Sequence, residues 1–133
     1  MATIRRTFTV DADSPSVWDV YRDIGALHTR LVPGFVTNTV LEDGARMVTF
    51  ANGMTVRERI VSVDEERRRL AYSATGGRTA HHNASVQVFD EGSGKCRVEW
   101  ITDLLPGDMA GAIEGMMDQA VGIMQRTLAR RAG

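Results

Sequence analysis

The chain has 133 residues, a length that suits one domain with a single hydrophobic core. Its 16 Lys and Arg residues nearly balance 17 Asp and Glu residues, so the formal net charge is −1. A protein without a basic field does not attract a phosphate backbone, and we expect no nucleic acid partner. We therefore expect a single domain over residues 1–133.

Cysteine content and apolar patterning bear on location. Cys96 is the lone cysteine, so no internal disulfide can form, which suits a reducing compartment. No continuous apolar stretch has the length of a signal peptide core or a membrane span. We expect a cytoplasmic protein that does not insert into a membrane. The sequence does not indicate an oligomeric state.

The first part of the chain predicts one strand followed by two short helices. Residues 3–11 alternate between apolar and polar side chains, a period of two that is typical of a strand with one buried face. Ser14 and Pro15 then mark a helix start, because Ser accepts hydrogen bonds from free backbone amides and Pro is tolerated in the first turn. Residues 26–32 predict a second short helix, which a Pro-Gly pair ends.

The middle of the chain predicts a series of hairpins. Asp43 with Gly44 and Asn52 with Gly53 are dipeptides suited to two-residue hairpin turns, so the strands that they join are antiparallel neighbours. The six strands predicted in this region span residues 35–42, 45–51, 54–64, 69–75, 83–90 and 95–104.

The last segment predicts a long amphipathic helix. Asp108 follows a Pro-Gly pair and is placed to cap the helix N-terminus. Seven apolar residues then recur at spacings of three and four, as on one face of a helix: Ile113, Met116, Met117, Ala120, Val121, Met124 and Leu128.

Together these elements predict an α+β helix-grip fold. A seven-stranded curved antiparallel sheet wraps around the long C-terminal helix, with two short helices after strand 1. Gly111, Gly115 and Gly122 each weaken the helix by about 1 kcal/mol relative to Ala. Close packing against the sheet or a bend explains them, or they leave room for a ligand or partner.

Short motifs resemble those of the plant abscisic acid receptors. Residues 55–60 read TVRERI, residues 64–68 read DEERR, Gly76 and Gly77 follow, and Asn83 precedes a strand. With the order of elements, they resemble the Bet v 1-like superfamily, also called START-like or SRPBCC, and especially its bacterial polyketide cyclase/dehydratase-like branch. The resemblance implies a START-like domain with a cavity between the concave sheet face and the C-terminal helix. In that family the cavity holds apolar molecules such as lipids, sterols, hormones or polyketides.

Two departures argue against hormone sensing. The lysine that anchors the ligand in the receptors falls where this chain has Thr37, so a salt bridge to a carboxylate ligand is not expected. Thr37 itself stays a candidate ligand contact. The loop that gates the receptor cavity, between the third and fourth strands, shrinks to about Asn52 and Gly53.

Glu58 is the most informative candidate residue. In the strand over residues 54–64 it shares parity with Met54, Val56 and Ile60, which places a carboxylate on the inward face. A buried carboxylate requires a partner, water or protonation, since an unpaired buried charge costs several kcal/mol. Either Glu58 orients a polar ligand group or acts as acid or base, or it pairs with an Arg or faces outward. The resemblance implies the orienting role.

Two histidines and one asparagine are further candidates at the expected cavity mouth. His82 and Asn83 lie where the chain re-enters the sheet after the Gly pair, and His82 is the second candidate acid or base. His28, on the second short helix, is a candidate at the entrance. For each histidine, a surface or packing role is the alternative.

Aromatic and aliphatic side chains are candidates for the cavity wall. Trp100 and Tyr72 share parity with apolar neighbours on their strands, which predicts that both face the concave side. Met117, Val121 and Met124 lie on the apolar face of the last helix, where flexible thioethers adapt to irregular ligands. Plain core packing is the alternative for all five.

Three functions remain open. A carrier for a small apolar ligand needs only burial and a few orienting groups. A polyketide cyclase or dehydratase would use Glu58, His82 or His28 to move a proton. A module that modulates a protein partner would need an exposed apolar patch. The sequence has no nucleophile elbow, phosphate loop, zinc motif or dinucleotide fingerprint, and we expect no cofactor and no metal.

Overall fold

The computed structural model describes residues 1–76 and 78–132, with side chains described for residues 1–76 and 78–129. Seven strands, two α-helices and three short helical turns follow one another in this part of the chain. In chain order they are β1 (Ala2–Val10), α1 (Ser14–Arg22), η1 (Ile24–Ala26), η2 (Leu27–Leu31), β2 (Val36–Glu42), β3 (Ala45–Phe50), β4 (Thr55–Asp64), β5 (Arg69–Thr75), β6 (His81–Gly92), β7 (Lys95–Leu105), η3 (Gly107–Met109) and α2 (Ala110–Ala132).

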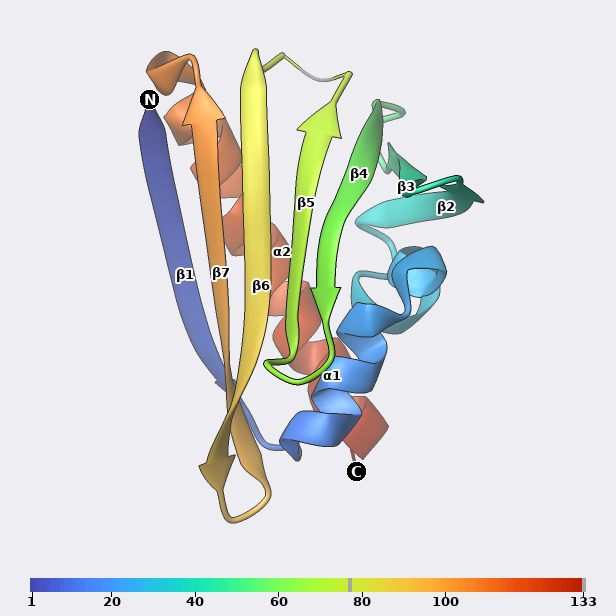
Figure 1. The fold of residues 1–133 in the computed structure, drawn as a ribbon, viewed down its shortest axis with the longest axis vertical. Coiled ribbons are helices and arrows are strands. Elements are labelled where there is room, and N and C mark those ends of the chain that lie inside the picture. The colour runs from blue at the N-terminus through green and yellow to red at the C-terminus, as the bar shows by residue number, and fades with distance from the viewer. Residues whose placement is uncertain (77, 133) are drawn as a thin grey trace.

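The strands form one antiparallel sheet in the order β1-β7-β6-β5-β4-β3-β2. The long helix α2 crosses behind the sheet, and α1 lies beside its lower end (Figure 1). Strands β2 and β3 turn away from the direction of the other strands, which bends the sheet around the helix (Figure 1). The predicted α+β helix-grip fold is confirmed.

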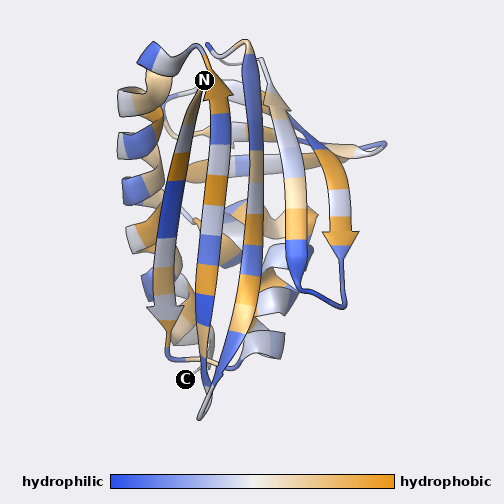
Figure 2. Ribbon diagram, turned by 60° about the vertical axis from the view of Figure 1, so that its left-hand side comes forward, coloured by the Kyte–Doolittle hydropathy of each residue, from blue (hydrophilic) through white to orange (hydrophobic). Residues whose placement is uncertain are grey.

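The core lies between the concave sheet face and α2. In β7 every second residue from Cys96 to Leu104 is buried, and Figure 2 shows the same alternation of hydrophobic and hydrophilic residues along the strands. Helix α2 adds Met117, Ala120 and Leu128, each almost fully buried. Burying a side chain such as Leu128 stabilises the fold by about 1.5–3 kcal/mol. The predicted apolar stripe therefore covers the sheet.

The first helix begins with a different cap from the predicted one. The Asp13 carboxylate accepts a hydrogen bond from the backbone N–H of Ser16 at 2.8 Å, whereas Ser14 is the first helical residue and is buried. The prediction that Ser14 caps α1 is wrong by one residue. Asp serves the cap as well as Ser does, and Pro15 still falls in the first turn, where a missing N–H costs nothing.

The second short helix is irregular. A 3-10 turn over Ile24–Ala26 precedes one π-helical turn over Leu27–Leu31, closed by the N–H of Val32 donating to the Leu27 carbonyl. A Cβ added at Gly25 would lie 3.1 Å from the Leu41 side chain. This close approach to β2 favours glycine at residue 25.

The long helix starts without a side-chain cap. Its first turn is the 3-10 segment η3, whose N-cap is Pro106 and has no side-chain cap hydrogen bond. The prediction that Asp108 caps the helix is wrong, because Asp108 already lies in the first turn, where its charge favours the positive end of the helix dipole.

The helical glycines do not reflect close packing. A Cβ at Gly111 or Gly115 would meet nothing within 4 Å, and one at Gly122 would lie 3.6 Å from an Arg126 nitrogen. The close-packing explanation is therefore wrong for these positions.

Within the described residues, no helix combines the length and the apolar composition that a membrane crossing requires.

Candidate functional site

A cavity of about 590 Å³ lies between the concave sheet face and α2. Its walls come from the inward faces of β2 to β7 and from α1, η2 and α2. Most lining side chains are apolar, among them Val20, Leu31, Val86, Met116 and Met117. This volume lies within the range of pockets that enclose drug-sized ligands. The sheet and the terminal helix therefore leave the space that the resemblance implies.

An ion pair between Arg46 and Glu58 lies inside the cavity. Arg46 on β3 and Glu58 on β4 are cross-strand partners, and both side chains line the cavity. Arg46 Nε donates to Glu58 Oε1 at 2.8 Å, and Arg46 Nη1 donates to the Ile24 carbonyl at 3.2 Å. Only 5% of the Arg46 side chain and 11% of the Glu58 side chain are exposed. Glu58 faces inward as predicted, and an Arg is its partner.

The turn between β3 and β4 creates this pairing. The register pairs Thr49 with Thr55 and Arg46 with Glu58, so the loop spans residues 51–53 rather than the predicted two residues. Gly53 takes a φ of +88°, the left-handed conformation that three-residue hairpin loops favour. A two-residue turn would have placed Arg59, not Glu58, opposite Arg46. The prediction of a two-residue turn at this site is therefore wrong.

Tyr72 and Trp100 adjoin the Arg46–Glu58 pair, and together these residues form the polar end of the cavity. The Arg46 guanidinium carbon lies 5.4 Å from the centre of the Tyr72 ring, and Trp100 Nε1 donates to the Tyr72 hydroxyl at 3.2 Å. Both aromatic residues are buried and line the cavity. Burial raises the pKa of Tyr72, and the Glu58 charge raises it further, so the phenol keeps its proton at neutral pH.

His82 lines the same cavity from β6. Burial lowers the pKa of His82, although the Glu58 charge opposes this effect. The imidazole is therefore uncharged at neutral pH and able to accept a proton. No hydrogen bond joins the His82 side chain to another described residue, which leaves its ring nitrogens available to a ligand.

Six of the predicted site residues line the cavity together. They are Glu58, Tyr72, His82, Trp100, Met117 and Met124. Tyr21 also lines it and donates to the Met124 sulfur at 3.4 Å, which holds that part of α2 against α1.

Four other predicted residues do not line the cavity. β6 begins at His81, earlier than predicted, and because His82 faces inward its neighbour Asn83 is exposed on the opposite face. Thr37 lies at a register shift between β2 and β3, is exposed, and donates to the Thr49 carbonyl at 3.2 Å. Neither Asn83 nor Thr37 therefore faces the cavity.

The remaining two of these four lie in helical segments. His28 is half-buried on η2, and its Nδ1 is buried without a hydrogen bond to any described residue. Val121 is half-buried on α2, where it packs against the hydrophobic core and does not line the cavity. Neither His28 nor Val121 is part of the cavity wall.

Arg46 and Thr102 are buried polar residues of the cavity that were not among the candidates from the sequence. Arg46 shares parity with buried Val48 on β3, and this alternation was the available signal. Thr102 on β7 is almost fully buried, and its Oγ1 makes no hydrogen bond within the described residues. Its parity with Trp100 placed it inward, but a small hydroxyl between apolar neighbours gave no sign of a site.

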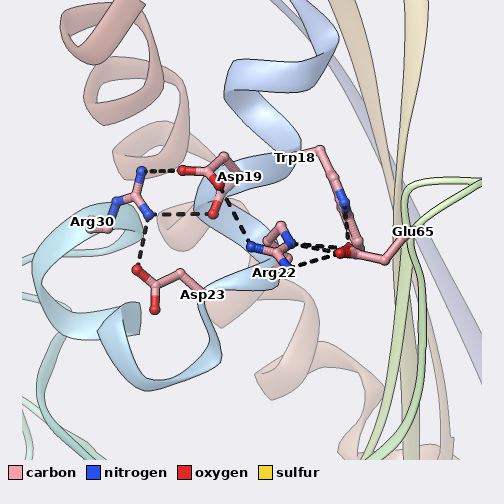
Figure 3. A network of polar contacts seen from close by, with 6 residues as sticks. All are labelled: Trp18, Asp19, Arg22, Asp23, Arg30 and Glu65. Atoms are coloured by element: carbon pink, nitrogen blue, oxygen red, sulfur yellow. Dashed lines mark hydrogen bonds and ion pairs between the residues drawn. The ribbon is translucent and has the colours of Figure 1, made fainter.

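An exposed network of ion pairs holds the helical wall of the cavity. Glu65, in the turn after β4, accepts from Trp18 Nε1 at 2.9 Å and from Arg22 Nη2 at 2.8 Å (Figure 3). Arg30 on η2 pairs with Asp19 at 3.0 Å and with Asp23 at 2.9 Å (Figure 3). The network links α1, η2 and the β4–β5 turn, and so positions the helices that border the cavity.

Known structures share this fold. A solution structure from Thermobifida fusca matches with 27% identity and a TM-score of 0.82, covering 100% of this chain and 94% of that one. Norcoclaurine synthase from Thalictrum flavum, in complex with dopamine and hydroxybenzaldehyde, matches with 20% identity and a TM-score of 0.76, covering 97% and 84%. A START superfamily protein from Mycobacterium smegmatis matches with 12% identity and a TM-score of 0.74, covering 98% and 96%.

The family assignment comes from the sequence comparisons. No curated protein matches this chain. The family model described as polyketide cyclase/dehydrase and lipid transport matches residues 1–131. The match spans nearly the whole chain and agrees with the helix-grip architecture. The chain therefore belongs to the polyketide cyclase/dehydrase and lipid transport family.

Proposed function

We propose that this protein binds a small hydrophobic or amphipathic molecule, of lipid, polyketide or aromatic type, in the cavity between sheet and α2. The observation that carries the proposal is the cavity itself, about 590 Å³ with mostly apolar walls and a few polar side chains. Apolar walls supply affinity through burial, and a few fixed polar groups orient the ligand. The family description, which includes lipid transport, agrees with this proposal.

The test uses a cavity-filling substitution with a matched control on the same strand. Ala74 on β5 lines the cavity, whereas Ala71 lies on the opposite face and pairs with Ser85. We expect Ala74→Phe to weaken binding of an apolar fluorescent dye at least tenfold, and Ala71→Phe to leave it unchanged. Native mass spectrometry of protein from its own host should show a co-purified ligand that Ala74→Phe loses. Equal dye affinity in both variants would contradict binding in the cavity.

A second candidate function is catalysis in the same cavity, of the polyketide cyclase or dehydratase kind. The observation that favours it is an uncharged His82 facing the same space as Glu58, which supplies a proton acceptor inside an apolar pocket. The fold neighbour that holds dopamine and hydroxybenzaldehyde lends support, because it binds two aromatic molecules on this architecture.

Turnover and binding separate the two functions. If the protein is an enzyme, His82→Gln should abolish turnover of a poly-β-ketone substrate while its dissociation constant changes little. If it is a carrier, wild-type protein should release the bound compound unchanged. Turnover that survives in both His82→Gln and Glu58→Gln would contradict the assignment of either residue as acid or base.

A further inference from the structure

Among the described residues, the charges that line the cavity are balanced, and only the Arg46–Glu58 pair is buried. Arg46 and Glu58 are the buried charged residues of the described chain. Of the other two charged lining residues, Asp23 is already paired with Arg30 and Arg78 is exposed to solvent. Solvent screens exposed charges strongly, so the buried pair dominates the field that a bound ligand meets.

The buried pair keeps unused hydrogen-bonding atoms. Arg46 uses Nε and Nη1, and Glu58 uses Oε1, so neither Arg46 Nη2 nor Glu58 Oε2 has a hydrogen bond within the described side chains. Both atoms retain accessible surface, because neither belongs to the fully buried side-chain atoms that lack a hydrogen bond. The pair therefore offers a donor beside an acceptor, with a net charge of zero.

A charged ligand would disturb this balance. A carboxylate that binds Arg46 also faces the Glu58 carboxylate, and three charges in an apolar pocket leave one without compensation. An uncompensated buried charge costs several kcal/mol, because the low dielectric weakens its solvation. A neutral group that accepts from Arg46 and donates to Glu58 makes two charge-assisted hydrogen bonds without that cost.

The neighbouring polar residues do not supply a compensating charge. Tyr72 and His82 are both uncharged at neutral pH, since burial raises the pKa of Tyr72 and lowers that of His82. Thr102 adds only a hydroxyl. The polar end of the cavity is thus rich in hydrogen-bonding groups and has no surplus of charge.

We propose that the Arg46–Glu58 pair makes the cavity selective for a neutral ligand that presents a donor beside an acceptor, such as a carboxamide or a hydroxyl next to a carbonyl, over a carboxylate. This selectivity rests on the proposed function, because it requires that the cavity binds a ligand.

Four naphthalenes of nearly equal size test the selectivity at pH 7.5. 2-Naphthamide carries a donor and an acceptor, 2-acetonaphthone an acceptor only, 2-naphthoate a negative charge, and 2-ethylnaphthalene no polar group. Dissociation constants come from isothermal titration calorimetry. We expect wild-type protein to bind the amide at least tenfold more tightly than the carboxylate, with the ketone between them.

Substitutions test whether the Arg46–Glu58 pair is responsible for the selectivity. Glu58→Gln leaves Arg46 without its counter-charge, so the order should reverse and naphthoate should bind more tightly than naphthamide. Arg46→Met combined with Glu58→Met removes both charges and keeps an apolar filling, so amide and ketone should bind equally. Arg59→Gln is the matched control and should leave the wild-type order unchanged, because Arg59 is exposed on β4 and does not line the cavity.

Each outcome decides between the proposals. If none of the four compounds binds, the proposed ligand-binding function fails. If ethylnaphthalene binds and naphthoate equals or exceeds naphthamide in wild-type protein, only the selectivity is overturned. An unchanged preference for the amide over the ketone in the double Met variant, or a loss of the wild-type order in Arg59→Gln, would also overturn the role of the pair.

Discussion

Two sets of ion pairs in this protein share their geometry and differ in their surroundings. Arg46 and Glu58 approach to 2.8 Å inside the cavity, and Arg22 and Glu65 approach to 2.8 Å on the outer side of α1. The exposed fractions are 5% and 11% for the inner side chains, but 47% and 54% for the outer ones. Distance alone therefore does not distinguish them.

The difference shows that surroundings set the energy of such contacts. Water screens the exposed network and competes for its hydrogen bonds, so such pairs contribute little. Inside the cavity wall, each charge depends on the other because little water can solvate either one. The outer network orients α1 and η2, whereas the inner pair decides which ligand chemistry the cavity accepts.

The largest effect is expected when the inner pair is broken. Arg46→Met leaves the Glu58 carboxylate buried without a counter-charge and should lower the free energy of unfolding by about 3–5 kcal/mol. Urea denaturation followed by circular dichroism measures this. The double variant with Glu58→Met should recover most of the loss, because apolar residues of similar volume replace a buried pair at little cost. A double variant as unstable as Arg46→Met would contradict the view that each of the two buried charges depends on the other.

A moderate, pH-dependent effect is expected from His82. Burial holds its folded-state pKa below the unfolded value of about 6.5, although the Glu58 charge opposes the shift and His81 adds to it. The unfolded chain then binds more protons as the pH falls, so stability present above about pH 6.5 is lost below it. His82→Gln should flatten this part of the curve of melting temperature against pH. Identical curves for wild type and variant would show that His82 is solvated.

The smallest effect is expected in the outer network. Glu65→Gln keeps an acceptor for Trp18 and loses only the charge that pairs with Arg22. The Arg22 hydrogen bond holds the pKa of Glu65 below its usual value of about 4.3. The stabilisation is therefore present above that pH and is lost as the pH falls through the folded-state pKa. We expect a slightly lower melting temperature at pH 7 that high salt abolishes.

A loss in Glu65→Gln as large as that in Arg46→Met, or one unchanged by salt, would break the comparison between the two sets.

Local patterns in the sequence determined most of the fold and one side of the site. Alternation in β4, β5 and β7 placed Glu58, Tyr72 and Trp100 on the concave face, and helical spacing placed Met117 and Met124 opposite them. These predictions succeed because the period of a strand or a helix is a property of the backbone itself. The Asp43-Gly44 turn was predicted for the same reason, and the register pairs Glu42 with Ala45.

Only the tertiary structure decided which residues meet. One extra loop residue before β4 brings Arg46 rather than another side chain opposite Glu58, and an earlier start of β6 settles that His82 faces inward and Asn83 outward. Register depends on loop length and on contacts between distant segments, which a local pattern does not contain. The cavity depends on the curvature of the sheet and the position of α2, which are set by the packing of the whole chain.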